Sequence, residues 1–428
     1  MMKGQNRKGV LTMLLRKAIS VLLLMLTVLL TGCTGKPGAP HTAPVRLQNQ
    51  SRAQLHLGLP EPEPEPAEIQ EKTVIAAWIP YFIVEALLSA PDPEAAVNEL
   101  LDALQSFGVN TVFVHVCAFG ESIYPSAYYP LLPAAADSNA LPMIRDACRA
   151  HGIAFHAWIN PLRLQTAEYM EMQSGTSRLH RMYSDPETRK TALSEWSGRY
   201  YLNPAADSTA DFLAGAVTEL ITGYSPDGIH IDDYFYPTAE TAFDAADFAA
   251  SGEEDLGQWR RSSITKLIRR MNAAVHAADP GAVFSVSPQG KLTENLDVQF
   301  ADVQTWLRED GCCDWIIPQL YFGYQNPNAP FSELLRSWTT LPRRDGIRLI
   351  IGLAAYKDGQ TDPHAGEAAE EWRTTPLLLV QQAEDVLSDG NTDGVALYHA
   401  VSLRNLPENT AASLRKVLAD TVKNAAEP

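Results

Sequence analysis

The sequence is poor in cysteine and in positive charge, and both shortages limit what the protein can be. Its 428 residues include five cysteines and no Cys-x-x-Cys pair, so buried free thiols are expected, without a disulfide framework or thiolate metal site. It has 34 Lys and Arg against 51 Asp and Glu, and this net charge of −17 argues against nucleic acid or another polyanion as partner. A neutral polymer suits this charge better, although acidity also serves solubility. No Gly-x-Gly-x-x-Gly follows the first predicted strand, so no dinucleotide and no other cofactor is expected.

The first 32 residues are typical of a bacterial lipoprotein signal peptide. Five basic residues and no acid accompany an apolar stretch, Ala18–Leu30, that is too short to span a bilayer comfortably. Leu-Thr-Gly-Cys at 30–33 resembles the lipobox, where the signal peptide is cleaved before a cysteine that becomes acylated. The sequence therefore predicts lipid on Cys33 and an extracytoplasmic protein anchored to a membrane. The alternatives are an ordinary signal peptide with a chance cysteine, and an uncleaved anchor.

Residues 33–72 are predicted to form a disordered linker rich in Pro and Glu. Glu and Pro alternate at 61–66, and this composition favours extended polyproline II over a packed core. The remaining chain, residues 73–420, has a length that suits one large barrel domain better than several small ones. The linker would hold this domain away from the membrane.

Eight short apolar segments rich in β-formers alternate with helical stretches after residue 73. Helical spacing is clearest at 93–107, 208–223 and 256–278. This alternation predicts an α/β fold of the (β/α)8 TIM-barrel type, because a count of eight favours closure over the rival open, doubly wound sheet. The predicted strands are 74–80, 111–117, 153–159, 228–234, 282–288, 314–321, 347–353 and 394–399.

Side-chain alternation along these strands brings polar groups together. Successive residues of a strand face opposite sides, and the apolar neighbours of each polar residue are expected to face the helices. Polar residues from five strands then converge on the barrel axis, whereas a purely structural interior would hold branched apolar side chains. The residues predicted to face inward are His115, Cys117, His156, Trp158, Asn160, His230, Asp232, Ser285, Ser287, Gln319 and Tyr321.

The run Asp-Gly-Ile-His-Ile-Asp-Asp-Tyr-Phe-Tyr-Pro at 227–237 is the most informative motif. It places two adjacent acids and several aromatics at the carboxyl end of a strand, where β/α barrels keep their catalytic groups. Hydrolysis of a glycosidic bond generally needs two carboxyl groups that flank the bond. Asp232 is the first candidate because alternation points it into the barrel, with a structural carboxylate as the alternative. Asp233 reaches the pocket only if the strand ends there, so catalysis and a supporting role are equally open for it.

The second catalytic carboxylate is less obvious, because strands five to seven end without an acid. Glu121, in Phe-Gly-Glu-Ser just after the second strand, is the best placed remaining acid, with an ordinary loop glutamate as the alternative. Glu294, after the fifth strand, is a weaker candidate. The missing acid supports a rival interpretation, in which the protein is a non-catalytic glycan-binding lipoprotein on a degenerate barrel.

A cluster of inward histidines allows a third interpretation, a metal-dependent hydrolase or deacetylase. His115, His156 and His230 lie on neighbouring predicted strands, and Asp232 follows the last of them. Imidazole and carboxylate are common metal ligands, but His-x-x-x-His spacing is absent and histidines also bind sugars. No metal is therefore predicted.

The connections after the third and seventh strands, 161–207 and 356–376, are long and rich in aromatics. Aromatic rings beside a barrel mouth offer flat faces on which sugar rings stack. These loops are predicted to form the walls of a glycan groove, with packing inside the loops as the alternative. The residues concerned are Tyr183, Trp196, Tyr200, Tyr201, Asn203, Tyr356, Lys357 and Trp372.

Six motifs occur in order on six predicted strands or their loops, between about residues 75 and 405. They are GESIYPS at 120–126, HAWINPLR at 156–163, the run 227–237, SVSP at 285–288, IPQLY at 317–321 and IGLAAYK at 351–357. Together they resemble the bacterial glycosyl-hydrolase-like 10 family of extracellular glycosidases, which are often lipoproteins. The resemblance implies a TIM-barrel glycosidase. A member of that family cleaves peptidoglycan glycan strands stripped of their peptides, which implies the same substrate here.

The predicted site joins these motifs with the inward positions. Asp232, Asp233 and Glu121 are the predicted catalytic residues. The predicted substrate contacts are His115, His156, Trp158, Asn160, Arg163, His230, Tyr234, Gln319, Tyr321 and Tyr356.

Two departures from the family pattern affect the predicted site. The family usually has Asp where this chain has Glu121, and an Arg near Cys117 that is missing here. The strand-four run is also similar to the Asp-Gly-x-Arg-x-Asp run of α-amylase-type barrels, whose nucleophile corresponds to Asp232. In chitinase-like barrels an acidic Glu stands where this chain has Tyr234, which argues against a chitinase.

Overall fold

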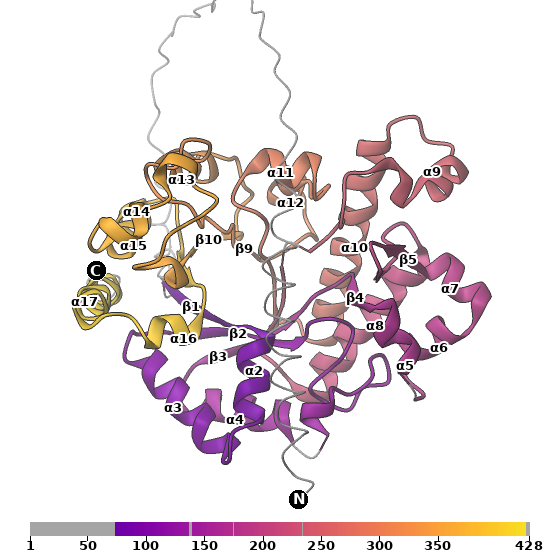
Figure 1. Cartoon of the computed structure of the whole chain (residues 1–428), viewed down its shortest axis with the longest axis horizontal. Coiled ribbons are helices and arrows are strands. Elements are labelled where there is room, and N and C mark those ends of the chain that lie inside the picture. The colour runs from indigo at the N-terminus through magenta and orange to yellow at the C-terminus, as the bar shows by residue number, and fades with distance from the viewer. Residues whose placement is uncertain (1–72, 137–138, 174, 233, 425–428) are drawn as a thin grey trace, which may run out of the picture. The chain divides into compact units, whose positions relative to one another are not determined.

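The computed structural model describes residues 73–136, 139–173, 175–232 and 234–424. The predicted signal peptide and linker, the lipidated Cys33 and Asp233 therefore lie outside the described residues. Eight parallel strands close into a barrel, which confirms the predicted TIM-barrel fold (Figure 1). In order around the barrel they are β1 (Val74–Ile79), β2 (Thr111–Cys117), β3 (Ala154–Ile159), β7 (Gly228–Ile231), β8 (Val283–Val286), β9 (Trp315–Ile316), β10 (Arg348–Leu353) and β11 (Gly394–Leu397).

Helices follow the strands and cover the outside of the barrel. The expected helical stretches are confirmed as α3 (Pro93–Gln105), α8 (Asp207–Tyr224) and α10 (Leu256–Ala278). Local chemistry sets their ends. Asp92 accepts a hydrogen bond from the Ala95 N–H at the start of α3, and Asp255 does the same for Gln258 in α10. None of the helices in the described ranges is long and apolar enough to cross a membrane.

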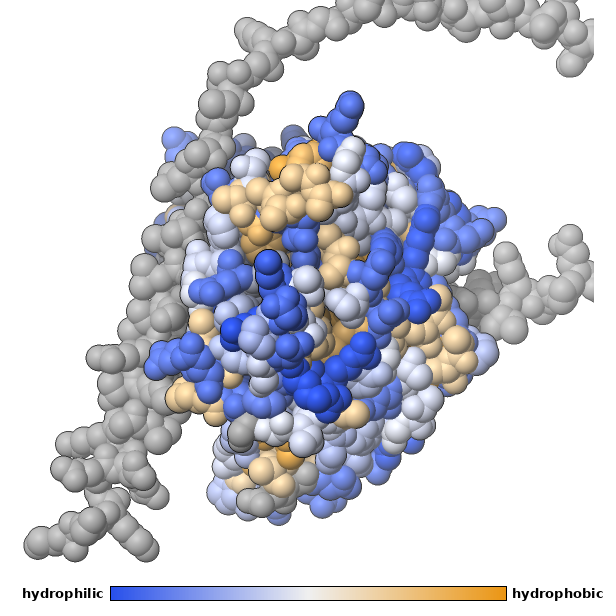
Figure 2. Space-filling view, turned by 90° about the vertical axis from the view of Figure 1, so that its right-hand side faces the viewer, coloured by the Kyte–Doolittle hydropathy of each residue, from blue (hydrophilic) through white to orange (hydrophobic). Residues whose placement is uncertain are grey.

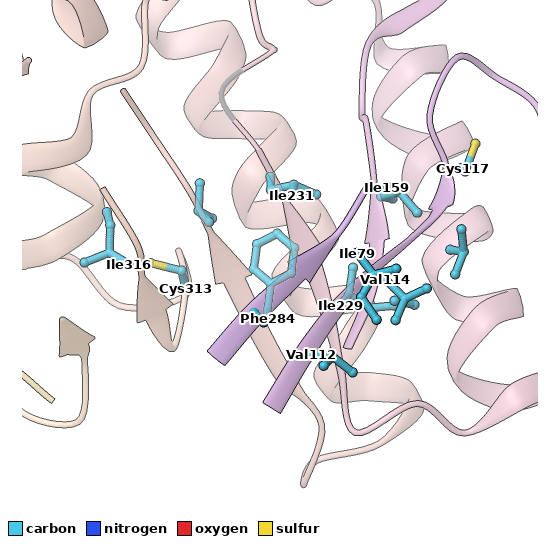
Figure 3. Packing of buried hydrophobic residues seen from close by; sticks show 14 of the residues in the cluster. Ile79, Val112, Val114, Cys117, Ile159, Ile229, Ile231, Phe284, Cys313 and Ile316 are labelled. Atoms are coloured by element: carbon cyan, nitrogen blue, oxygen red, sulfur yellow. The ribbon is translucent and has the colours of Figure 1, made fainter. Parts of the chain in front are cut away.

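The main hydrophobic core lies between the barrel and its helices. Alternate strand residues, among them Val112, Val114, Ile229, Ile231 and Phe284, are fully buried there (Figure 3). Each such side chain stabilises the fold by about 1.5–3 kcal/mol relative to an exposed one. A smaller cluster fills the barrel itself and consists of Val74, Ala76, Trp78, Phe113, Trp158, Ile317, Ile350 and Ala396.

A repeated polar contact closes the amino-terminal end of the barrel. At four strand pairs, the residue just before one strand accepts a hydrogen bond from a backbone N–H of its neighbour. Asn110 accepts from Ile75, Asp227 from Phe155, Asp314 from Phe284 and Asp393 from Leu349, over 2.7 to 3.2 Å. These bonds satisfy strand N–H groups and fix the register. Asp227, the first acid of the 227–237 run, is therefore structural and lies at the opposite end of β7 from Asp232.

One inward prediction, Cys117, is wrong. The register between β2 and β3 shifts after His115, so that Cys117 pairs with Ile159 and not with the residue that strict alternation requires. This β-bulge turns Cys117 outward, where it packs in the main core near Ile159 (Figure 3). The expectation of buried thiols is confirmed for all four described cysteines, which are buried and unpaired.

The long connection after β3 is a small folded unit and not an irregular loop. It contains the antiparallel strands β4 (Arg163–Thr166), β5 (Leu193–Trp196) and β6 (Arg199–Leu202), with α5 (Ala167–Met172), α6 (Arg178–Ser184) and α7 (Pro186–Ala192). Ser197 and Gly198, both with positive φ, form the two-residue turn that joins β5 to β6. Figure 2 views the side that carries this unit, where hydrophilic residues surround short hydrophobic patches.

Most of the aromatic residues predicted to line a groove pack against neighbouring side chains, either in their own loop or in the connection after β7. Tyr183 stacks edge-on against Tyr200, and Trp196 contacts Phe243 in the same manner. Tyr201 and Trp372 are buried. Asn203 donates a hydrogen bond to the Thr191 carbonyl. The structural alternative therefore describes these residues better, whereas Tyr356 remains 39% exposed.

Candidate active site

The carboxyl ends of the strands bring Asp232 together with a group of tyrosines. Asp232 follows β7 directly and is 3% exposed. Tyr398 follows β11, and its pKa is raised well above the usual value, mainly by burial and further by nearby Tyr234, Tyr356 and Asp232. Because β7 and β11 are strands of one closed parallel barrel, Asp232 and Tyr398 follow them at the same mouth. A carboxylate at this end of a barrel strand occupies the position where such folds keep catalytic acids.

Three aromatic rings form a cluster at this mouth. The ring centroids of Tyr321 and Tyr356 lie 5.7 and 5.8 Å from that of Tyr398, and 6.1 Å from each other. Tyr321 and Tyr356 were predicted from the sequence as substrate contacts, and the structure places them together. Tyr398 was missed, although its position at the end of the eighth strand is a signal that could have identified it.

A pair of arginines also lies at the mouth, beside Phe119. The Arg163 guanidinium is 5.1 Å from the ring centroid of Phe119 and 4.7 Å from that of Tyr234, and Arg199 is 5.4 Å from the same Phe119 ring. Phe119 lies two residues after Cys117, the position near which the family usually has an arginine. That arginine is missing here, but Arg163 and Arg199 bring two cations to the same region. Arg163 was predicted as a substrate contact. Arg199 was not, because its place depends on the pairing of β4 with β6.

His115 and Trp158 form a stacked pair beside these arginines. Their ring centroids are 3.7 Å apart with an interplanar angle of 9°. The pKa of His115 lies well below the usual value because the ring is buried, and the nearby Arg163 lowers it further. Neither His115 nitrogen nor the Trp158 indole N–H has a hydrogen-bond partner in the described structure. Buried polar atoms normally have partners, so these atoms mark a place for ligand or water.

His230 and His156 lie deeper, inside the packed barrel. His230 is fully buried, accepts a 3.0 Å hydrogen bond from the Trp78 indole and contacts the Ser285 hydroxyl at 2.8 Å. His156 is 1% exposed and contacts the Trp315 ring at 5.0 Å. Burial lowers the pKa of His156 to about 3, so the ring is neutral at ordinary pH. Both histidines face inward as predicted, but their placement favours positioning of the strands over the predicted contact with substrate.

Glu121 is held by the unit that follows β3. Its carboxylate accepts hydrogen bonds from the Tyr169 hydroxyl at 2.6 Å and from the amides of Gln165 and Gln173 at 2.7 and 3.3 Å. Gln165 lies on β4 and Tyr169 on α5. This arrangement fits a carboxylate that ties the unit to the barrel, while its catalytic role stays a prediction.

The other predicted polar residues have structural contacts near the mouth. Gln319 donates to the Ser287 carbonyl at 3.2 Å, and Asn160 donates its backbone N–H to the Cys117 carbonyl. The Asn160 side-chain oxygen is buried without a partner among the described residues. Glu294 forms an ion pair with Lys291 at 2.9 Å.

Aromatic rings separate the histidines that the metal interpretation required to converge. The Phe113 ring stacks on His230 at 4.0 Å and lies edge-on to His156 at 5.5 Å, whereas His115 stacks on Trp158. Within the described residues, no three His, Cys, Asp or Glu side chains are placed to hold a metal ion.

A separate hollow of about 810 Å³ lies on the outside of the barrel domain, lined by α8, α10 and α12 (Val303–Arg308). Its charged side chains pair with one another, as in the ion pairs Lys266–Asp207, Arg270–Asp211 and Arg269–Glu309. The hollow shares no lining residue with the barrel mouth, where His115, Trp158 and Asn160 carry buried polar atoms without a partner among the described residues. The mouth is therefore the better candidate site.

Comparison with known proteins agrees with this architecture. The β-galactosidase from the psychrophilic Marinomonas ef1 superposes with a TM-score of 0.52 at 10% identity, covering 82% of this chain and 60% of that one. The cold-adapted β-galactosidase from Rahnella sp. R3 gives 0.51 at 11% identity, covering 84% and 57%. At such low identity these matches show the fold alone.

Similarity in sequence is more specific. "Glycosyl hydrolase YngK" of Bacillus subtilis (strain 168) is 26% identical over 321 residues, which cover 68% of this chain and 61% of that protein. "Glycosyl hydrolase DigH" of Escherichia coli (strain K12) is 28% identical over 298 residues, covering 62% and 67%. The chain thus spans less than two thirds of the length of YngK. The model of the family described as "Glycosyl hydrolase-like 10" matches residues 76–367, so the chain belongs to this family.

Proposed function

We propose that the protein is a lipid-anchored glycoside hydrolase that acts on cell-wall glycan, specifically on peptidoglycan glycan strands that lack peptides. The observation that carries this proposal is the buried carboxylate of Asp232 at the carboxyl end of β7, at the mouth of a barrel whose family is glycosyl hydrolase-like. The exposed rings of Tyr234 and Tyr356 support it, because they offer stacking surfaces at the same mouth.

In this proposal Asp232 is one of the two carboxyl groups that flank the scissile bond. It either attacks the anomeric carbon or assists proton transfer, as the paired carboxylates of glycosidases do. Asp233 and Glu121 remain the candidates for its partner. The three hydrogen bonds that Glu121 accepts favour Asp233 for that role.

Replacement of Asp232 by Asn tests the proposal. The change keeps the size of the side chain but removes its charge and basicity, so we expect turnover of purified peptide-free glycan strands to fall by about 10²- to 10⁴-fold. Released oligosaccharides would be separated and quantified by chromatography. Asp146→Asn, on the exposed side of α4 (Ala140–Ala150), is the matched control and should keep full activity. Undiminished turnover by Asp232→Asn would refute the assignment.

A non-catalytic glycan-binding protein is the second candidate. The three hydrogen bonds that Glu121 accepts favour a binding protein over an enzyme, because they give one of the predicted catalytic acids a structural role. Binding of glycan strands by the wild-type protein without release of any product would establish this alternative.

The membrane anchor is proposed from the lipobox at 30–33 and belongs to the same function, since it would hold the enzyme near the cell wall. We expect the protein to be recovered in the membrane fraction and to incorporate labelled fatty acid. Cys33→Ala should abolish both signals, whereas Cys148→Ala should leave them intact. Lipid labelling of the Cys33 variant at the wild-type level would exclude this anchor.

A further inference from the structure

Two guanidinium groups share one aromatic ring at the barrel mouth. Arg163 and Arg199 lie 5.1 and 5.4 Å from the centroid of Phe119. Strand pairing explains their closeness. Arg163 of β4 pairs with Tyr201 of β6, and Arg199 lies two residues from Tyr201 and therefore on the same face of that strand. The unit after β3 thus brings two positive charges to the same aromatic ring, in a chain whose net charge is −17.

Within the part of the chain that the structure describes, no carboxylate forms an ion pair with either arginine. By contrast, nine other arginines among the described residues have acidic partners, such as the buried Arg260–Asp244 pair. Burial lowers the pKa of Arg199, and the charge of Arg163 lowers it further. Both causes oppose a positive charge at this position, and the hydrogen bond that Arg199 donates to the Leu164 carbonyl offsets them only in part, so a bound anion would be favourable beside these two half-buried cations.

The pair adjoins the buried polar atoms that lack partners. Arg163 lies close enough to His115 to lower the pKa of its ring, and His115 stacks on Trp158. Both His115 nitrogens, the Trp158 indole N–H and the Asn160 side-chain oxygen are buried and unpartnered in the described structure. These atoms offer two donors and two acceptors to the hydroxyl and amide groups of a sugar next to the cations. Together the two features indicate a ligand that is both a sugar and an anion.

We propose that Arg163 and Arg199 bind a carboxylate carried by a sugar residue of the substrate. Guanidinium groups match carboxylates through paired hydrogen bonds, and two of them around one anion would relieve their mutual repulsion. The proposal rests on the proposed function and deepens it. In peptide-free peptidoglycan strands every lactyl group ends in a free carboxylate, whereas in peptide-bearing strands the same carbon forms a neutral amide. The arginine pair would therefore select strands from which the peptides have been removed.

Binding of matched ligands tests this selectivity without dependence on turnover. The affinity of the full-length protein would be measured by titration calorimetry for a peptide-free muramyl oligosaccharide and for the same oligosaccharide with its carboxyls converted to methyl amides. We expect the wild type to prefer the acid by about 10- to 100-fold, as the loss of charged hydrogen bonds implies. Arg163→Gln and Arg199→Gln should each reduce this preference to below about 3-fold, because they should weaken binding of the acid far more than binding of the amide.

Two controls guard against misfolding and general loss of charge. Arg189→Gln removes another arginine of the same unit, which lies 5.0 Å from the Tyr183 ring, and should keep the wild-type preference. Arg163→Lys keeps the charge but loses the forked geometry, so it should retain only part of the preference. Equal affinity of the wild type for acid and amide, or an equal loss for both ligands in the glutamine variants, would overturn the proposal.

The result also separates this inference from the proposed function. If the wild type prefers the acid over the amide through its arginines but cleaves no glycan, the carboxylate site is upheld and the hydrolase is refuted. If it cleaves glycan but binds acid and amide equally, the hydrolase is upheld and the carboxylate site is refuted. A trigalacturonate titration distinguishes the source of the carboxylate. Arginine-dependent binding of trigalacturonate alone would uphold the anion site and assign it to a uronic acid, which would refute the selection of peptide-free strands.

Discussion

At the scale of single residues, Glu121 is the position where the structural and catalytic interpretations make different predictions. Because its carboxylate accepts hydrogen bonds from Gln165, Tyr169 and Gln173, Glu121→Gln replaces an acceptor by a group that also donates. We expect the free energy of unfolding to fall by about 1–3 kcal/mol. Turnover of glycan strands should fall far less than in Asp232→Asn. Urea unfolding and product release measured on the same preparations check both expectations.

The opposite pattern would identify Glu121 as the second catalytic carboxylate. In that case Glu121→Gln would lose as much turnover as Asp232→Asn while its unfolding curve stayed that of the wild type. Glu219 provides a control, because its carboxylate also accepts bonds from a neighbouring loop, at Ser126 and Ala127, but belongs to α8 on the outside of the barrel. Glu219→Gln should destabilise the protein and leave turnover per folded molecule unchanged.

The sequence predicted individual site residues only where local geometry alone decides their direction. Alternation along β7 was sufficient to point His230 into the barrel, where it contacts the interior residues Trp78 and Phe113. It did not reveal that Trp78 and Ser285 occupy both nitrogens of His230, because these partners come from other strands. Arg199 was beyond prediction for the same reason, since its position depends on a strand pairing between residues far apart in the chain.

At the scale of elements, the strands were predictable and their irregularities were not. All eight predicted strands occur, because apolar β-rich segments separated by amphipathic helices carry a strong periodic signal. The bulge after His115 carries no such signal, and it alone turns Cys117 away from the axis. The unit at 163–202 was hidden because its strands have four residues each, too few for periodicity to show.

The same elements explain why the arginine pair can evolve independently of the barrel. Asp232 is carried by a barrel strand that is fixed by neighbours on both sides, whereas Arg163 and Arg199 are carried by a small sheet inserted after β3. Loops and insertions on a rigid barrel commonly carry specificity, while strand ends carry the chemistry. The division of roles proposed above follows this rule.

At the scale of the whole molecule, the stability of the barrel should depend on pH through its buried histidines. His115, His156 and His230 line the interior of one closed barrel, and burial holds all three pKa values well below the usual one, that of His156 at about 3. In the unfolded chain each imidazole has a pKa of about 6.5 and therefore binds a proton below that pH. In the folded state the same imidazole stays neutral over this pH range. The contribution of these three neutral histidines to the free energy of unfolding is therefore complete above about pH 6.5, and it is lost progressively as the pH falls below that value.

We expect the free energy of unfolding to fall with decreasing pH below about 6.5, by up to about 1.4 kcal/mol per pH unit for each histidine. Urea unfolding between pH 7.5 and 5.0 measures this slope. His156→Gln should lower the free energy of unfolding at pH 7.5. It should also reduce the slope of that free energy against pH, between pH 6 and 5, by the contribution of one histidine, because one titrating group is gone. His364→Gln changes an exposed side chain and should leave this slope unchanged. An unaltered slope in the His156 variant would mean that its imidazole titrates alike in both states, and the barrel would then have to admit a charge where the structure packs only aromatic rings.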